Sequence, residues 1–310
     1  MSVTPATAAS DSAAADISRT TIEAAATRIA PFIIETPLIE SPRLNDKLGI
    51  RLLVKAECLQ HTGSFKLRGA SNAVWSLDDT VKHVVAFSSG NHAQGVARAA
   101  ASRGLQATIV MPKDSPAGKI EGTKAYGGTV ILYDRYTESR EEIGADLATR
   151  KQAHLIKPFD DARVIAGQGT VGLEIATQAA AKNLTPDAIM CCCGGGGLIA
   201  GMSIAASDMI PGVDIWAAEP EFYDDTRRSL ASGKIETADI TMPSICDSIV
   251  TAQPGETTFP INKKLLSGSA VITDRDALLA VATAFKHLKI IIEPGGAAAL
   301  AAVLTGQYPA

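Results

Sequence analysis

Short apolar runs alternate with longer, alanine-rich segments along most of the chain. Six β-prone runs occur, and most of them are followed by a stretch of helical composition. Strand followed by helix, repeated along a chain, is the pattern of a mostly parallel sheet covered by helices. The sequence therefore predicts an α/β fold. The six runs cover residues 51–55, 83–87, 107–111, 129–132, 188–193 and 214–218.

The spacing of these runs predicts two lobes, each with its own mostly parallel, twisted sheet flanked by helices. The three runs between residues 83 and 132 are closely spaced, whereas the two between 188 and 218 follow a longer helical interval. The length of 310 residues suits two modest cores, because a domain commonly holds about 150 residues. The expected segments are a flexible leader over 1–16, a large domain over 17–75 and 159–310, and a small mobile domain over 76–158.

Two further helices are predicted near the two ends of the chain. Residues 20–29 have helical composition up to the interruption at Pro31. A second helix is expected over 273–289, where Asp274 and Asp276 occupy the first turn. Its apolar side chains share one face, formed by Leu278, Leu279, Ala282, Phe285 and Leu288.

Charge and aromatic content exclude one class of partner. The chain has 29 Lys and Arg against 33 Asp and Glu, a net charge of −4, and 5% aromatic residues. Nucleic-acid binding needs a basic surface and usually stacking aromatic side chains, and neither is concentrated anywhere in this sequence. The longest uncharged run, 188–207, contains four successive glycines, which would destabilise a membrane-spanning helix. We therefore expect neither nucleic-acid nor membrane binding, and we divide that run into a strand, a glycine loop and a helix.

Cysteine usage indicates a reducing compartment. The five cysteines are an odd number in a chain too large to need disulfides, and residues 1–16 lack the basic start and apolar stretch of a secretory signal. A cytoplasmic location is therefore expected. Cys191, Cys192 and Cys193 alternate between the two faces of a predicted strand, so they cannot share one metal ion. We expect them to be buried as small apolar residues.

Three segments contain groups that suit an anionic ligand. Residues 88–92, Ser-Ser-Gly-Asn-His, lie between a predicted strand and a helix, where free backbone N–H groups meet anions; they either hold a carboxylate or cap the helix. The four glycines at 194–197 let the backbone approach a phosphate, although neither G-x-G-x-x-G nor the nucleotide P-loop fits. Lys66 follows a Gly-Ser turn and Phe65, and alone it would be a solvated lysine at a helix start.

Acidic residues mark two further candidates. Glu219 and Asp225 are six apart and could share a hard cation with a backbone carbonyl between them, whereas Glu221 and Asp224 are expected to be solvated. Glu293 interrupts an apolar run. It either caps the following helix or points into a cleft from the end of a strand.

Six motifs in order resemble the pyridoxal-phosphate enzymes of the serine/threonine dehydratase and serine racemase family, also called fold type II. They are TGSFKLRGA at 62–70, SSGNHAQG at 88–95, IAGQGTVGLE at 165–174, GGGGLIAG at 194–201, AEPEFYDD at 218–225 and IEPGGAAALAAVL at 292–304. The resemblance covers about residues 20–308. It implies the two-lobed architecture of that family, a small amino-acid substrate and a homodimer.

Position by position, the resemblance assigns roles to individual residues. Lys66 forms the Schiff base with pyridoxal phosphate, Phe65 lies against the ring, and Asn91 bonds the ring hydroxyl. The other cofactor contacts are Gly194, Gly195, Gly196, Gly197 and Leu198 at the phosphate, together with Glu293. The resemblance assigns binding of the substrate carboxylate to Ser88, Asn91 and His92. It assigns coordination of a divalent cation, Mg²⁺, Ca²⁺ or Mn²⁺, to Glu219, the carbonyl of Tyr223 and Asp225.

The implied reaction is β-elimination from a β-hydroxy amino acid, with L-serine and L-threonine as first choices, to a 2-oxo acid and ammonia. Lys66 takes the α-proton while the cofactor acts as electron sink. Ser89 matches the acid/base on the opposite face, which racemisation would need. Two alternatives use the same scaffold: a 3-hydroxyaspartate dehydratase or amino-acid racemase, and a non-catalytic protein that binds pyridoxal phosphate or an amino acid.

Arg140 bears on the choice of substrate. Racemases and 3-hydroxyaspartate dehydratases of the family carry a segment similar to the Ser-Arg-Glu at 139–141, and a guanidinium can hold a second carboxylate through two bonds. An exposed helix arginine paired with a neighbouring glutamate is an equally good interpretation of Arg140.

The sequence departs from the family pattern at two places. Family members usually end with a Ser-Gly-Gly-Asn turn whose serine faces the pyridine nitrogen, but this sequence stops at Ala310. Either the chain is a shortened form or the nitrogen has another partner. Ser248 follows Asp247 where relatives commonly have glycine, so the contacts at that edge of the cofactor are expected to differ.

Overall fold

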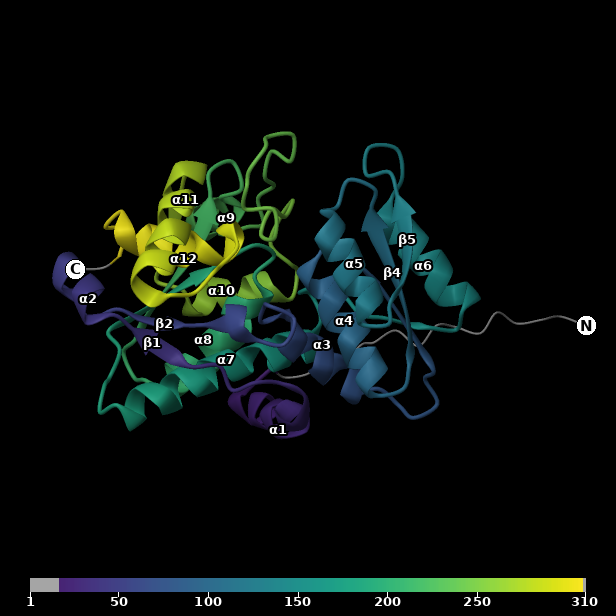
Figure 1. The fold of residues 1–310 in the computed structure, drawn as a ribbon, viewed down its shortest axis with the longest axis horizontal. Helices are drawn as coiled ribbons and strands as arrows, with labels where there is room; N and C mark the ends of the chain where they lie inside the picture. The colour runs from purple at the N-terminus through teal and green to yellow at the C-terminus, as the bar shows by residue number, and fades with distance from the viewer. Residues whose placement is uncertain (1–16, 309–310) are drawn as a thin grey trace, which may run out of the picture.

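The computed structural model describes residues 17–308, and the predicted leader at 1–16 lies outside that range. The described chain forms a four-stranded sheet and a three-stranded sheet, each covered by helices, together with a two-stranded antiparallel sheet. The two covered sheets lie side by side along the long axis of the molecule (Figure 1). The prediction of an α/β fold with two separate, mostly parallel sheets is confirmed.

The strands of the two larger sheets are all parallel. The bounds are β1 (Leu38–Glu40), β2 (Leu53–Lys55), β3 (His83–Phe87), β4 (Gln106–Pro112), β5 (Thr129–Tyr133), β6 (His154–Leu155), β7 (Ala188–Cys192), β8 (Asp214–Pro220) and β9 (Gly268–Ile272). The smaller lobe has the order β5-β4-β3-β6, and the larger has the order β7-β8-β9. All six predicted strands are present. The sequence pattern missed β1, β6 and β9.

The helices follow the strands as predicted. Their bounds are α1 (Arg19–Ile29), α2 (Pro42–Leu48), α3 (Lys66–Trp75), α4 (Asn91–Ser102), α5 (Ala117–Ala125), α6 (Arg140–Arg150), α7 (Ala162–Ala181), α8 (Gly197–Met209), α9 (Asp225–Ser232), α10 (Thr258–Leu265), α11 (Asp274–Thr283) and α12 (Pro294–Leu304). The uncharged run at 188–207 divides into β7, a glycine loop and most of α8, in agreement with the prediction. Among the described helices, none is both long enough and apolar enough to cross a membrane.

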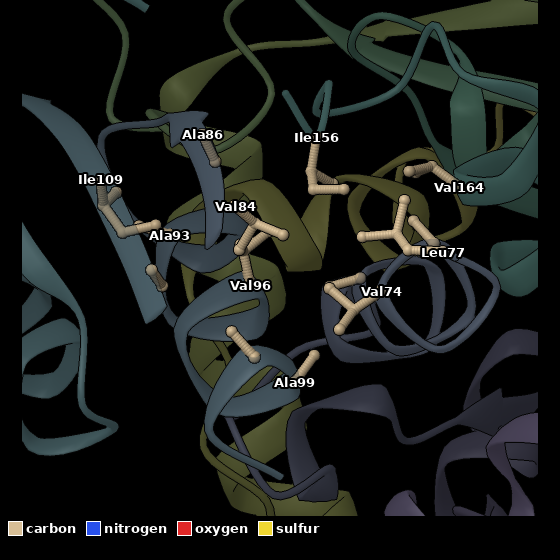
Figure 2. Packing of buried hydrophobic residues seen from close by; sticks show 14 of the residues in the cluster. Val74, Leu77, Val84, Ala86, Ala93, Val96, Ala99, Ile109, Ile156 and Val164 are labelled. Atoms are coloured by element: carbon tan, nitrogen blue, oxygen red, sulfur yellow. The ribbon is translucent and has the colours of Figure 1, made fainter. Parts of the chain in front are cut away.

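The four-stranded sheet is buried on both faces, because alternate side chains of each strand enter different apolar clusters. On one face, Val84 and Ile109 pack against Val74 of α3 and Val96 of α4 (Figure 2). On the other face, the cluster includes Phe87 of β3 together with residues of β4, β5 and α6. Helix α3 therefore contributes to the core of this lobe, and it also packs against α7. The domain boundaries and the mobility of the smaller lobe remain predictions.

The three-stranded sheet separates the three neighbouring cysteines. Cys191 and Cys193 are buried in the cluster that includes residues of α7 and α8, whereas Cys192 faces the cluster that includes α11 and α12. This confirms the predicted alternation of the three side chains. Cys192 is only partly buried, however. All five cysteines of the chain are free thiols in the structure.

Glycines allow α3, α7 and α8 to touch backbone to backbone. A Cβ placed on Gly201 of α8 would overlap the carbonyl oxygen of Ile165 in α7. A Cβ on Gly167 of α7 would lie 2.6 Å from the Cα of Gly69 in α3. Side chains at these positions would force the helices apart, because real Cβ atoms do not approach backbone so closely.

The predicted helix over 273–289 consists of α11 followed by a π-helix over Ala284–Leu288. Its buried side is formed by Ala277, Ala280 and Ala284, which pack closely against the alanine-rich α12. The larger apolar side chains point outward. Leu278, Leu279 and Phe285 are between 53% and 62% exposed. Close packing of small residues thus determines which face of this helix is buried.

Candidate active site

Lys66 begins α3 at the point where the two lobes meet. Its Nζ donates a hydrogen bond to the carbonyl oxygen of Pro158 at 2.9 Å. A Cβ on Gly95 of α4 would lie 3.2 Å from the Lys66 backbone, so α4 passes directly over the start of α3. The pocket around Lys66 is lined by Phe65, Pro158, Phe159, Gln168, Cys192, Cys193, Gly194, Gly195, Gly196, Gly197, Leu198, Ile199, Ser248, Ile249 and Thr251.

The environment of Lys66 lowers the pKa of its amine. Burial lowers the pKa of Lys66 from its ordinary value of 10.5 to about 8, and the nearby Cys192 and Glu293 oppose that shift only in part. A neutral lysine is the form that attacks carbonyl carbon and accepts a proton. Burial of Lys66 therefore increases the fraction of neutral amine near neutral pH relative to an exposed lysine, and covalent amine chemistry uses that form.

The glycine loop opposite Lys66 forms the start of α8. Gly196 is the N-cap with φ +87°, a conformation that favours glycine. No side chain caps the start of α8. A Cβ on Gly195 would lie 2.5 Å from the ring of Phe159. The backbone N–H groups of the first helical turn are therefore available to an anion, with the positive end of the helix dipole behind them.

Polar atoms around the glycine loop lack partners within the described residues. Both amide atoms of Asn262 are buried without a hydrogen bond, and its Nδ2 lies 2.5 Å from the position of a Cβ on Gly196. Thr251 Oγ1 and Gln168 Nε2, from the pocket lining, are also unpartnered. Buried polar groups without partners are rare in proteins. These donors and the N–H groups of the loop fit the phosphate of pyridoxal phosphate, and Lys66 fits its aldehyde.

The turn at 88–92 leaves the start of α4 uncapped. Ser88 Oγ accepts a hydrogen bond from the N–H of Gly90 at 3.1 Å, and no side chain caps the helix. Of the two interpretations of this turn, a Ser/Asn helix cap is therefore wrong. The first-turn N–H groups remain available to a carboxylate. Ser89 is half-buried and makes no side-chain hydrogen bond with any part of the chain that the structure describes.

His92 is buried and stays neutral. Its Nε2 lies 3.1 Å from the carbonyl oxygen of Ile156, and that contact requires the proton to be on Nε2. Nδ1 has no partner among the described residues. Burial, and then the charge of Lys66, lower the pKa of His92 to about 3. A neutral ring with an acceptor Nδ1 does not attract a carboxylate, so a contribution from His92 would come from its backbone N–H.

Glu293 faces the turn at 88–92. It occupies the N-cap position of α12 without a side-chain capping bond, and its Oε1 accepts a hydrogen bond from Nδ2 of Asn91. Lys119 of α5 lies nearby, with its Nζ 2.7 Å from Asp247 Oδ2 and 3.6 Å from Glu293 Oε2. The side chain of Glu293 therefore does not cap the helix. Neither Lys119 nor its contact with Asp247 was expected from the sequence, because nothing in the pattern of α5 sets this lysine apart.

The acidic residues at 219–225 are more deeply buried than expected. Glu219 is fully buried, and it accepts hydrogen bonds from the N–H groups of Thr226 and Arg227 at 2.7 and 2.9 Å. Asp225 is 1% exposed, and its Oδ2 has no partner among the described residues. Burial, and then the neighbouring Glu219, raise the pKa of Asp225 to about 8. The expectation that Asp224 is solvated is wrong, because it is buried and forms ion pairs with two arginines.

The donor chemistry at Glu219 and Asp225 fits a hard cation. An unpartnered carboxylate oxygen beside a second buried carboxylate is the arrangement that Mg²⁺, Ca²⁺ or Mn²⁺ would stabilise. Within residues 17–308, no group of three His, Cys, Asp or Glu side chains is placed to hold a metal ion. Backbone carbonyls, such as that of Tyr223, and water would have to complete such a site.

Arg140 lies beside the turn at 88–92. It begins α6, and its Nε donates to Oε1 of the neighbouring Glu141 at 2.8 Å. Its guanidinium carbon lies 5.3 Å from the ring centre of Phe87, the residue that directly precedes Ser88. The side chain is 47% exposed. Both interpretations of Arg140 therefore remain open, since it pairs with an adjacent glutamate and also lies close to the predicted carboxylate site.

A buried ion network supports the helix of Lys66. Arg68 has no exposed surface, and its guanidinium bonds Glu57 and Glu174 at 2.8 Å. Lys55 pairs with the same Glu174 at 2.6 Å. The network ties α3 to β2 and α7, behind the pocket. Sequence reasoning missed it because its members are up to 119 residues apart.

Comparison with known proteins agrees with this geometry. The family described as pyridoxal-phosphate dependent enzyme matches residues 29–309. A serine racemase of Oryza sativa subsp. indica is 40% identical over 300 residues, which cover 95% of this chain and 85% of that protein. An L-threo-3-hydroxyaspartate ammonia-lyase of Saccharomyces cerevisiae is 39% identical over 272 residues, 87% of this chain and 82% of that protein.

The fold is shared with solved structures. The crystal structure of a T.th. threonine deaminase superposes with a TM-score of 0.89 at 42% identity, and the match covers 94% of each chain. The structure of maize serine racemase has the same TM-score at 39% identity, with 94% of this chain and 87% of that chain covered. The chain belongs to the family of pyridoxal-phosphate dependent enzymes and has the fold type II architecture of its relatives.

Proposed function

We propose that this enzyme is an ammonia-lyase that converts a β-hydroxy amino acid, such as L-serine or L-threonine, to a 2-oxo acid and ammonia. The observation that carries the proposal is a buried lysine with a pKa of about 8, facing an uncapped glycine loop. A second uncapped helix start, at Asn91, belongs to α4, which passes over Lys66 at Gly95. Relatives named ammonia-lyase or deaminase agree with this assignment.

Different residues would bind the phosphate, the ring and the ring hydroxyl of the cofactor. The phosphate would be held by the backbone N–H groups of Gly194, Gly195, Gly196, Gly197 and Leu198. Phe65 would lie against the ring. Asn91, fixed by Glu293, would face the ring hydroxyl. Pyridoxal phosphate, when bound, supplies the electron sink that makes the α-proton of an amino acid removable.

On the substrate side, the N–H groups at the start of α4 and the hydroxyl of Ser88 would orient the carboxylate. The neutral Lys66 amine would then remove the α-proton, aided by a pKa near the working pH. Ser89 would be the acid/base for the opposite face. It bears on the second candidate, racemisation, which the relatives named serine racemase favour.

A panel of amino acids separates these activities. The holoenzyme is incubated with L-serine, L-threonine and 3-hydroxyaspartate, and ammonia, 2-oxo acid and D-amino acid are measured in the same samples. Equal amounts of ammonia and 2-oxo acid are expected. D-amino acid without ammonia would assign a racemase, and cofactor binding without any product would assign the non-catalytic alternative.

Arg140 is predicted to select substrates that carry a second carboxylate. Arg140→Ala should lower kcat/KM for 3-hydroxyaspartate roughly tenfold to a hundredfold and leave serine turnover nearly unchanged, because a charge-assisted pair is lost only with the acidic substrate. Arg135→Ala is the matched control, since Arg135 lies in the preceding loop and pairs with Asp114. Equal losses on both substrates would contradict the assignment.

Glu219, Asp225 and the carbonyl of Tyr223 are proposed to hold a divalent cation. In metal-free protein, Mg²⁺, Ca²⁺ or Mn²⁺ at about a hundred times its Kd should raise the free energy of unfolding by about 2.7 kcal/mol. Asp225→Asn should abolish this rise without destabilising the metal-free protein, because it removes a buried, unpartnered carboxylate. Glu221→Gln, in the same loop, should keep the response. A rise in Asp225→Asn equal to that of the wild type would count against the site.

The proposal extends to a homodimer in the cytoplasm. The free thiols of all five cysteines suit a reducing compartment. Leu278, Leu279, Phe285 and Ile291 are exposed on and just after α11, and exposed apolar groups of this kind suit a subunit contact.

A further inference from the structure

Lys119 lies between the two lobes at the edge of the candidate active site. It belongs to α5, which packs against α4 and β5 of the smaller lobe. Both of its acidic partners belong to the larger lobe. Asp247 is flanked by Cys246 and Ile249, which are buried in the apolar cluster of α11 and α12, and Glu293 directly precedes α12. The two ion pairs therefore cross the boundary between the lobes.

The stem of Lys119 also contacts the substrate-side turn. A Cβ on Gly90 would overlap Cδ of Lys119, so the lysine side chain passes directly over the backbone of this turn. One residue further on, Asn91 donates a hydrogen bond to Glu293, the second acidic partner. Lys119 thus touches the turn with its stem and the opposite lobe with its ammonium.

The burial of Lys119 distinguishes this contact from a fully exposed ion pair. The side chain of Lys119 is 17% exposed, against 43% for Asp247 and 32% for Glu293. A partly buried ammonium in contact with two carboxylates is screened less by salt than an exposed pair, and its loss leaves both acids without that partner.

We propose that Lys119 is a positioning residue that fastens α5 and the turn at 88–91 to Asp247 and Glu293, and so fixes the substrate-binding edge of the site. This inference rests on the proposed assignment of that turn as the carboxylate site. The lysine itself touches neither the glycine loop nor Lys66 in the contacts described. Its loss should therefore loosen the amino-acid side of the site more than it weakens cofactor binding.

Hydrogen exchange in the holoenzyme without amino acid tests the contact independently of catalysis. Lys119→Met and Asp247→Asn should each speed amide exchange over residues 88–91 and 117–125. The double variant should exchange no faster than the faster single variant, because both substitutions break the same contact. Lys124→Met is the matched control, since Lys124 is exposed on the same helix. Additive effects, or exchange in Lys119→Met equal to that of the control, would overturn the proposal.

Kinetics test the positioning role. Lys119→Met should raise KM for the amino-acid substrate roughly fivefold to tenfold, with kcat changed less than about threefold and the Kd of pyridoxal phosphate raised less than KM. Lys119→Arg, which keeps the charge, should restore most of the loss. Faster exchange with an unchanged KM would show that the contact stabilises the structure without affecting substrate binding. That result would overturn the positioning role. Absence of turnover in the wild type would instead refute the proposed function and leave the exchange result interpretable.

Discussion

Replacing Lys66 with alanine is expected to abolish ammonia release, with a loss of at least roughly 10³-fold, because the variant lacks both the amine that binds the cofactor covalently and the base that removes the α-proton. The cofactor should still bind at the glycine loop, whose donors do not include Lys66. Ammonia release and the visible absorbance of bound pyridoxal phosphate measure the two effects separately. Borohydride should attach the cofactor covalently to the wild type only, as intact mass will show.

The control for Lys66→Ala is Lys124→Ala, which removes an exposed lysine and should keep full activity and the covalent label. Turnover by Lys66→Ala within tenfold of the wild type would exclude Lys66 as the catalytic base. A borohydride label on another lysine would exclude it as the point of attachment.

Arg68→Met is expected to destabilise the protein by about 3–5 kcal/mol, because it leaves Glu57 and Glu174 in a buried site without their shared cation. Since Arg68 lies two residues after Lys66, the variant should also lose cofactor affinity. Urea unfolding of the holoenzyme, followed by circular dichroism, measures the stability change, and titration with pyridoxal phosphate measures the affinity.

The contrast for Arg68→Met is Arg51→Met. Arg51 forms a similar two-bond pair with Glu40, but 51% of its side chain is exposed, so we expect little change in stability. Comparable destabilisation by both substitutions would show that the buried network contributes no more than a surface pair.

Local sequence patterns predicted much of the fold and placed at helix starts the two turns that we propose bind anions. Strands β3 and β7 stand out as short apolar runs, and the polar or glycine-rich segments after them lie at strand ends and helix starts by the logic of a parallel sheet. These signals need only neighbouring residues. The roles of Lys66, Asn91 and Ser89 came from family resemblance, and they remain proposals.

Contacts between distant segments could not be predicted in the same way. Lys119 meets Asp247 across 128 residues, so that pair depends on how the lobes pack. Arg68 meets Glu174 across 106 residues, so that pair depends on how α3 packs against α7. His92 shows a related limit. Its place in the motif was clear, but the direction of its ring depends on the carbonyl of Ile156, which the sequence pattern does not reveal.

The glycine contacts of α7 have a consequence for the cofactor site. Helix α3 carries Lys66 and α8 begins at the glycine loop, and α7 touches the first at Gly167 and the second near Gly201. The separation between Lys66 and the glycine loop thus depends on two close backbone contacts, at positions where glycine has no side chain that could adjust. Helix α7 therefore acts as a spacer of fixed thickness between the two parts of the proposed cofactor site.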